Sequence, residues 1–184
     1  MGEHLELKEC GIPGVFLVQG RALEDRRGSF VKVYHRETFY RSGINEQFQE
    51  SYYSVSWKGV IRGMHFQAPP EDHSKLVYVT SGAIVDVVLD IRKGTSMYGK
   101  FVAFEINENN RCAVYVPRGC AHGFCALSDH TIVTYLQTSM HSPEHDFGIY
   151  YNSFGMDWPT KDPILSDRDN RFPAFEDFDS PFTD

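Results

Sequence analysis

The segment Pro117-Arg118-Gly119-Cys120-Ala121-His122 separates two strand-like runs and decides which fold the sequence predicts. Cys112–Val116 precedes it and residues 123–127 follow it, and both runs are rich in apolar or aromatic side chains. Proline and glycine between such runs indicate a turn, because proline fixes φ and glycine accepts backbone angles that other residues avoid. We therefore expect two strands joined at residues 117–119, with His122 close to the second strand.

Runs of the same kind recur along most of the chain, between turn signals such as Ser81-Gly82 and Lys93-Gly94. These further strands are expected at residues 14–18, 29–34, 52–56, 75–80, 83–91, 99–106 and 131–138. Helical patterns are limited to Arg36–Arg41 and residues 162–169. The sequence thus predicts an all-β sandwich or barrel with short helices. It contains neither GxGxxG nor GxxxxGK(S/T), the glycine-rich loops that bind nucleotides in α/β folds.

Length, composition and charge limit the function classes. The chain has 184 residues, which suits a single domain over residues 1–184, and 41% of them are hydrophobic. The formal net charge of −7 argues against general binding to nucleic acid or anionic membranes, since both are polyanions. Residues 1–7 include charged side chains and no apolar core of signal-peptide length, and no later segment approaches the roughly 20 apolar residues of a membrane span. We therefore expect a cytoplasmic enzyme or binding protein.

The four cysteines are Cys10, Cys112, Cys120 and Cys125, and they form no CxxC pair. Structural zinc sites favour closer pairs, so this spacing favours reduced, mostly buried thiols over a metal site.

The C-terminal tail, residues 172–184, contains Phe172, Phe175, Phe178 and Phe182 among proline and acidic residues. Such a tail could be disordered, but four phenylalanines favour packing onto the body of the protein or onto a neighbouring subunit.

The Pro-x-Gly-x-x-His pattern at residues 117–122 resembles the turn that places a histidine inside the barrel of cupins, which are double-stranded β-helix (jelly-roll) proteins. Metal-binding cupins carry His-x-His on a partner strand and a downstream glutamate. Here the strand-like segment 60–67 ends in His65-Phe66-Gln67, and Glu71 lies in a proline-rich loop. Strand alternation places His65 and Gln67 on one face. The resemblance therefore supports the jelly roll, whereas the missing second histidine argues against a metal.

A longer series of motifs resembles the dTDP-4-dehydrorhamnose 3,5-epimerase family. The motifs occur in the family's order between about Gly14 and Asp169 and identify the chain as a member. They are Arg62-Gly63-Met64-His65-Phe66-Gln67, Lys75-Leu76-Val77, Asp86-Val87-Val88-Leu89-Asp90-Ile91-Arg92, residues 117–124, Tyr135, Asp157-Trp158-Pro159 and Leu165-Ser166-Asp167-Arg168-Asp169.

This resemblance implies a jelly-roll homodimer, without metal or other cofactor, that acts on a nucleotide-linked 4-keto-6-deoxy sugar. The 4-ketone acidifies the protons on C3 and C5, so a base and an acid on opposite faces can invert either carbon. His65 matches the family's base, and Asp169 matches the carboxylate that orients it. Tyr135 matches the acid, and Lys75 matches the cation that stabilises charge on the C4 oxygen.

The residues alone leave other interpretations of these positions open. Tyr135 could be a core aromatic of its strand, and Lys75 could be a solvated loop lysine. His122 could be a hydrogen-bonded structural histidine.

The resemblance also implies a substrate-binding set. Arg27 and Arg62 match family residues that bind the diphosphate. Phe30 and Trp158 match aromatic residues that line the nucleotide site. On the residues alone, these could equally be turn charges and core aromatics. The full set is Arg27, Phe30, Lys32, Glu50, Tyr52, Arg62, Gln67, His122 and Trp158.

Three of these residues depart from the family pattern. Lys32 stands where the family usually has an acidic residue, and Glu50 and Tyr52 stand where it usually reads Gln-x-Asn. The usual tyrosine pair is also absent from Met140-His141-Ser142-Pro143-Glu144-His145. Because these changes fall on substrate-holding positions, we expect the chemistry to be kept and the substrate to be altered. The altered substrate could be a CDP- or GDP-linked sugar, or the enzyme could invert only one carbon.

Two other functions remain open. A ketoisomerase would move the carbonyl between C4 and C3 through the same enediolate. A non-enzymatic sugar-binding or metal-binding cupin would show a broken set of catalytic residues or a complete set of metal ligands.

Overall fold

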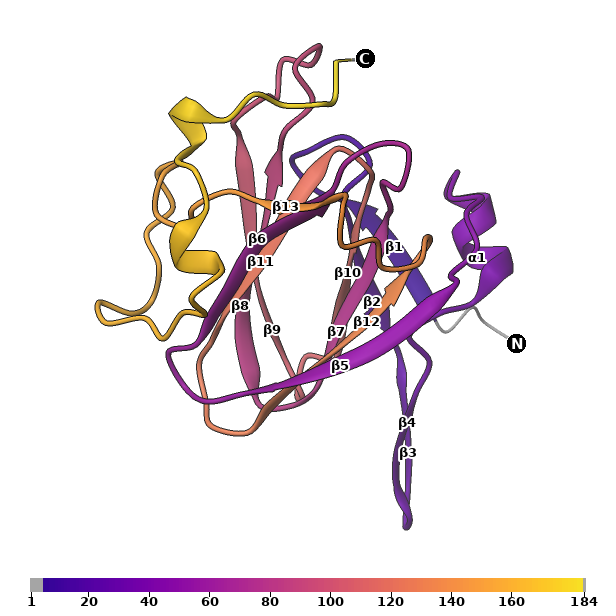
Figure 1. Ribbon diagram of the computed structural model, residues 1–184. Coiled ribbons are helices and arrows are strands. Elements are labelled where there is room, and N and C mark those ends of the chain that lie inside the picture. The colour runs from indigo at the N-terminus through magenta and orange to yellow at the C-terminus, as the bar shows by residue number, and fades with distance from the viewer. Residues whose placement is uncertain (1–4, 184) are drawn as a thin grey trace.

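Two antiparallel sheets face each other and form the body of the molecule (Figure 1) in the computed structural model, which describes residues 5–183. The six-stranded sheet has the order β1 (Leu5–Glu9), β2 (Phe16–Gly20), β10 (Cys112–Val116), β7 (Lys75–Ser81), β12 (Thr131–Gln137) and β5 (Glu50–Ser56). The five-stranded sheet has the order β13 (Asp146–Gly148), β6 (Ile61–Gln67), β11 (Cys120–Ala126), β8 (Ala83–Asp90) and β9 (Phe101–Asn107).

The turn at residues 117–119 crosses between these sheets, because β10 lies in the first and β11 in the second. Gly119 has φ +74°, a backbone angle that glycine adopts without the steric cost of a side chain. The predicted turn and both flanking strands are therefore confirmed, and with them the all-β, jelly-roll class.

The other predicted strands are also confirmed to within a few residues, including the one that carries His65. Three short strands were not predicted: β1, β13 and β3 (Ala22–Asp25). β3 forms a separate hairpin with β4 (Gly28–Val31), which projects away from the body (Figure 1). Polar and charged side chains mask the strand pattern in these segments, and β13 has only three residues.

The helix α1 (Arg36–Arg41) is confirmed, but the helix expected at residues 162–169 is wrong. Pro163 disfavours the helical conformation at the residue before it. Ile164 instead forms a parallel bridge to Val60, and its N–H donates to the carbonyl of Gly59. Helical structure in this region is limited to two short 3₁₀ turns, η1 (Asp169–Arg171) and η2 (Phe175–Asp177).

The hydrophobic core lies between the sheets, and a second apolar layer covers the outer face of the five-stranded sheet. Every residue of β11 is buried, because one face meets the core and the other meets the C-terminal segment. Phe178 and Phe182 both pack against Phe66, with ring centroids 5.4 and 6.1 Å away. The described part of the tail therefore packs onto the body, as the phenylalanines predict, while residue 184 lies outside the described residues.

Helix α1 covers part of the outer face of the six-stranded sheet, where buried Phe39 contacts Tyr34 and Tyr115. None of the helices within residues 5–183 has the length and apolar character needed to cross a membrane.

Candidate active site

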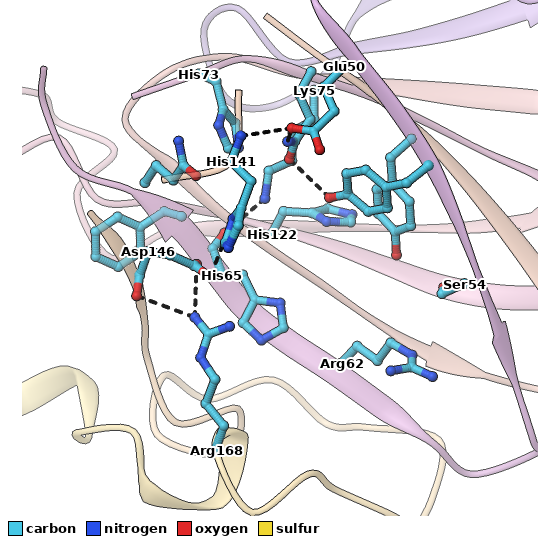
Figure 2. A pocket seen from close by; sticks show the side chains of 15 residues that line it. Glu50, Ser54, Arg62, His65, His73, Lys75, His122, His141, Asp146 and Arg168 are labelled. Carbon is cyan, nitrogen blue, oxygen red and sulfur yellow. Dashed lines mark hydrogen bonds and ion pairs between the residues drawn. The ribbon is translucent and has the colours of Figure 1, made fainter. Parts of the chain in front are cut away.

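A cavity of about 400 Å³ opens between the two sheets (Figure 2). Strands β5, β7 and β12 line it from one sheet, and β6 and β11 line it from the other. It is lined by Glu50, Tyr52, Ser54, Arg62, His65, Phe66, Gln67, His73, Lys75, His122, Tyr135, Gln137, His141, Asp146 and Arg168. The structure thus brings eight of the predicted site residues to one place: His65, Lys75, Tyr135, Glu50, Tyr52, Arg62, Gln67 and His122.

Strand alternation on β6 directs His65 and Gln67 into this cavity, while Met64 packs into the apolar cluster of the opposite face. His65 is paired directly with His122 of β11 in the antiparallel register. Both histidines therefore line the same wall.

Asp169 lies behind His65 and completes a hydrogen-bonded pair with it. His65 Nε2 is 2.9 Å from Asp169 Oδ1, and the backbone N–H of Gly63 donates to Oδ2 at 3.1 Å. Burial alone would raise the pKa of the Asp169 carboxyl, but the hydrogen bonds and the charge of His65 outweigh it and lower that pKa. The carboxylate is therefore ionised at neutral pH and can only accept, so His65 Nε2 is the donor.

Gly63 is required at its position because β6 and β11 approach closely there. Its φ is +139°, and a Cβ atom at this residue would lie 2.5 Å from the Cα of Gly123. This tight crossing places the N–H of Gly63 against Asp169, two residues from His65. In the Arg-Gly-Met-His sequence, the glycine therefore allows the close approach of the two strands, and the histidine enters the site.

A second histidine–aspartate pair lies deeper in the same wall. His122 Nε2 is 2.7 Å from Asp86 Oδ2, and the side chains are 4% and 0% exposed. Asp86 comes from β8, and its other oxygen, Oδ1, has no hydrogen-bond partner within residues 5–183. Asp86 had no predicted role, although a carboxylate inside the apolar run 83–91 was a usable signal.

Tyr135 and Tyr52 stack across the opposite wall, with ring centroids 4.8 Å apart and an interplanar angle of 18°. Burial raises the pKa of both phenols, so both keep their protons at neutral pH. Tyr52 donates to Gln137 Oε1 at 2.9 Å. Tyr135 also contacts the ring of His122 edge-on at 6.2 Å.

Lys75 is buried on β7 and is not a solvated loop lysine. Its Nζ donates to the backbone carbonyl of His65 at 3.3 Å. Burial lowers the pKa of Lys75 to about 8, although the charges of Asp146 and Asp86 oppose this shift. The ammonium group is therefore mostly protonated at neutral pH but is unusually easy to discharge.

Four predicted substrate-binding residues do not line the cavity. Arg27 and Phe30 lie on the projecting β3–β4 hairpin, where Arg27 pairs with Asp25, and Lys32 follows the same hairpin. Trp158 is buried in the layer outside the five-stranded sheet, where its indole N–H donates to the carbonyl of Tyr151. Within one chain these residues are separate from the site.

Seven cavity residues had no role predicted from the sequence, and four of them have ionisable side chains: His73, His141, Asp146 and Arg168. Arg168 forms an ion pair with Asp146 at 2.8 Å, and His141 Nδ1 lies 3.9 Å from the same carboxylate. Arg168 precedes Asp169 directly, so its position in that motif was the available signal.

The described residues offer little for a metal ion. Within residues 5–183, no group of three or more histidine, cysteine, aspartate or glutamate side chains is arranged to hold one. All four cysteines are free thiols, and burial raises the pKa of Cys120 to about 12. The cavity side chains themselves include acids, bases and charged groups.

Comparison with known proteins finds that the chain is similar to epimerases of dTDP-linked sugars. A family model described as dTDP-4-dehydrorhamnose 3,5-epimerase matches residues 9–177. The chain is 36% identical over 169 residues to dTDP-4-dehydrorhamnose 3,5-epimerase of Methanothermobacter thermautotrophicus, covering 89% of this chain and 91% of the relative. It is 36% identical over 168 residues to dTDP-4-dehydrorhamnose 3-epimerase of Streptomyces niveus, covering 90% and 81%.

The fold is also similar to that of a solved epimerase structure. It is dTDP-6-deoxy-D-glucose-3,5-epimerase from Legionella pneumophila Philadelphia 1 in complex with dTDP-4-keto-L-rhamnose. The TM-score is 0.91 at 30% identity, and the match covers 96% of this chain and 95% of that one.

Proposed function

Because this chain belongs to the dTDP-4-dehydrorhamnose 3,5-epimerase family, and is therefore an epimerase of nucleotide-linked 4-keto-6-deoxy sugars, we propose that it works by proton transfer between His65 and Tyr135. One observation carries this proposal: the two side chains enter one cavity from opposite sheets, His65 from β6 and Tyr135 from β12. A sugar ring held between them has a base on one face and an acid on the other, which is what inversion requires.

His65 removes the proton from the carbon next to the ketone. Its Nε2–H is held by the Asp169 carboxylate, so Nδ1 carries the free lone pair. The same carboxylate stabilises the imidazolium that forms when Nδ1 takes the proton. Asp169 is thus a positioning residue that also balances charge.

Lys75 stabilises the enolate that this step creates. Its ammonium group is buried beside His65, where a fixed positive charge acts more strongly on a developing oxyanion than it would in water. Tyr135 then returns a proton to the opposite face, and its raised pKa means that the phenol holds a proton ready for transfer. All of these groups are side chains of the protein, so the proposed reaction uses no cofactor.

Arg62 and Arg168 supply the positive charge that a diphosphate requires, and both line the cavity. Glu50 and Tyr52, two of the three residues that depart from the family pattern, also line it. We therefore retain the alternatives of a CDP- or GDP-linked substrate and of inversion at one carbon. The single-carbon alternative has a precedent in the relative named as a 3-epimerase, which is as similar to this chain as a relative named as a 3,5-epimerase. Titration of the protein with dTDP, CDP and GDP tests the nucleotide, and a clear preference for dTDP would remove that alternative.

We also propose a homodimer in which each β3–β4 hairpin reaches the partner's cavity. Phe30 is 61% exposed on this hairpin, and Tyr53 and Trp57 are 68% and 56% exposed on and next to the edge strand β5. Exposed aromatic residues of this kind mark protein interfaces. This arrangement accounts for Arg27 and Phe30, which match substrate-binding residues but lie away from the site of their own chain.

Mixed dimers test this arrangement. Chains with His65→Ala and chains with Arg27→Ala are each expected to be weakly active, whereas a mixture allowed to exchange subunits forms hybrid dimers with one intact site. An equal mixture is expected to recover about a quarter of wild-type activity, since half of the dimers are hybrids. No recovery after confirmed exchange would mean that the hairpin does not complete the partner's site.

A cytoplasmic location is proposed on the basis of the four free thiols, which suit a reducing compartment. The reaction itself is tested by incubating the protein with dTDP-4-keto-6-deoxy-D-glucose in D₂O and following C3 and C5 by NMR. Epimerisation is expected to place deuterium at C3, C5 or both. A 3-keto product would support a ketoisomerase instead.

A further inference from the structure

His73 has a buried nitrogen atom that nothing in the described chain uses. The residue lies between β6 and β7, is 8% exposed and lines the cavity beside Lys75 and Glu50 (Figure 2). Within residues 5–183, its Nε2 atom has no hydrogen-bond partner. A buried polar atom without a partner costs free energy, which a ligand in the cavity can remove.

The hydrogen bonds around Ser139 determine what this nitrogen can do. The Ser139 hydroxyl donates to the carbonyl of Glu71 at 3.0 Å, so its single proton is already used. His73 Nδ1 lies 3.2 Å from the same oxygen, and with the Ser139 proton on the Glu71 carbonyl we assign Nδ1 as the donor of that bond. A neutral imidazole that carries its proton on Nδ1 has a lone pair on Nε2. His73 thus holds an unpaired, buried acceptor in the wall of the cavity.

The ring stays neutral in this environment. Burial lowers the pKa of His73 to about 2, and the positive charges of Lys75 and Arg118 act in the same direction. The lowered pKa means that His73 is neutral near neutral pH, where its Nε2 atom carries a lone pair.

We propose that His73 Nε2 accepts a hydrogen bond from a hydroxyl group of the sugar, and that it is a specificity-determining residue of the cavity. The proposal rests on the proposed function, because it takes the reacting sugar to lie beside His65 and Lys75. The group that His73 reads must be a donor, which excludes the C4 ketone and the phosphate oxygens. The nearby charges of Lys75 and Arg118 disfavour an ammonium group, and the donors of a 4-keto-6-deoxy sugar are its hydroxyl groups.

The position of His73 favours the sugar over the diphosphate. In Figure 2, His73, Lys75 and Glu50 lie together at one end of the cavity, whereas Arg62 lies at the other, beyond His65. Glu50 adds a second acceptor at this end: its Oε2 atom accepts from the backbone N–H of His141 at 2.7 Å and from Gln137 at 3.4 Å, and its Oε1 atom has no hydrogen bond within residues 5–183. Two acceptors at one end suit a polyhydroxylated ring.

Calorimetric titration with matched ligands tests this inference. The free nucleotides dTDP, CDP and GDP are compared with dTDP-glucose, CDP-glucose and GDP-glucose, and the best-binding pair is used. For His73→Phe, which removes the acceptor, we expect binding of the glucose-linked member to weaken about 3- to 10-fold, the equivalent of one hydrogen bond. Binding of the free nucleotide should be unchanged. His73→Gln keeps an amide oxygen near the Nε2 position and should retain most of the affinity.

His35→Phe is the matched control, because His35 is exposed at the start of α1 and does not line the cavity. Thermal unfolding of each variant shows whether it has folded. Equal weakening of both ligands by His73→Phe, or no weakening of either, would overturn the assignment to the sugar. Failure of the wild-type protein to bind any of the three pairs is a different result, since it would overturn the proposed function and the inference with it.

Discussion

The two histidine–aspartate pairs have the same chemical groups at nearly the same separation but differ in access. The side chain of His65 is 29% exposed and that of Asp169 is 5% exposed, whereas those of His122 and Asp86 are 4% and 0% exposed. The Nε2–oxygen distances are 2.9 and 2.7 Å. Proton transfer to a substrate requires contact with it, so the open pair suits a base. The buried pair is better suited to stabilising the cavity wall.

The residues around each pair also distinguish a pair that is open to the cavity from one that is enclosed by the sheet. Asp169 comes from η1, outside the sheets, and leaves the other side of the His65 ring facing the cavity. Asp86 and His122 lie on adjacent strands inside the five-stranded sheet, and the His122 ring meets the edge of Tyr135. We therefore propose that the open pair acts on the substrate and that the closed pair positions Tyr135.

The largest effect is expected for His65→Ala. Loss of the base should slow deuterium uptake at C3 and C5 by about 10²- to 10⁴-fold, the usual contribution of a general base. Thermal unfolding should change little, because the side chain lies at the cavity surface. NMR of the sugar nucleotide in D₂O measures the exchange. Exchange at the wild-type rate would show that the base lies elsewhere. The exposure of the His65–Asp169 pair would then not mark it as the catalytic one.

Tyr135→Phe should have the next largest effect and a different signature. Without the phenol, the enolate still forms, so deuterium should enter the substrate from the His65 face without inversion. Formation of the epimerised product should fall about 10²-fold or more. The ratio of exchange to epimerisation, followed by NMR in one sample, measures this. An equal fall in both rates would mean that Tyr135 is needed before proton removal.

Matched substitutions at the two carboxylates test the comparison directly. Asp169→Asn should lower kcat about 10- to 100-fold, because the amide stabilises imidazolium poorly, while the melting temperature stays close to that of the wild type. Asp86→Asn should lower the free energy of unfolding by about 1–3 kcal/mol, since it changes a buried hydrogen-bonded carboxylate. Its effect on kcat should be smaller. Chemical denaturation and steady-state kinetics on both variants suffice, and the reverse pattern would exchange the two roles.

Local sequence patterns were sufficient for the strands and for one wall of the cavity. Strand alternation places His65 and Gln67 together, and the turn at residues 117–119 brings His122 onto the neighbouring strand. The positions of Lys75 and Tyr135 in the site followed from resemblance, because a lysine or tyrosine at the same place in a strand is equally common outside an active site. Their roles remain predictions.

The features that local patterns missed depend on packing between distant segments. Residues 162–169 have the composition of a short helix, but their backbone hydrogen bonds go to the start of β6. Trp158 faces the covering layer and not the cavity, a choice that depends on how the C-terminal segment crosses the sheet. Likewise, the unpaired nitrogen of His73 becomes visible only when Ser139 is brought beside it, 66 residues along the chain.

The smallest predicted effect concerns Lys75, which is coupled to the closed pair through its charge. Lys75 must be protonated to stabilise the enolate, so kcat/KM should fall as the pH rises through its pKa of about 8. The charge of Asp86 raises the pKa of Lys75, whereas the Asp169 carboxylate is paired with His65. Asp86→Asn should therefore move the falling limb of the pH profile to lower pH, with a roughly twofold loss of kcat/KM at pH 8, and Asp169→Asn should leave the limb in place.

The pH–rate profiles of the wild type and the two variants, measured well below their melting temperatures, provide the check. Lys75→Arg is the control for the assignment of the limb, because a guanidinium group stays protonated and should remove the fall near pH 8. A limb that persists in Lys75→Arg belongs to another group. A limb that moves in Asp169→Asn would mean that the open pair also sets the charge of Lys75, and the two pairs would then not be electrostatically separate.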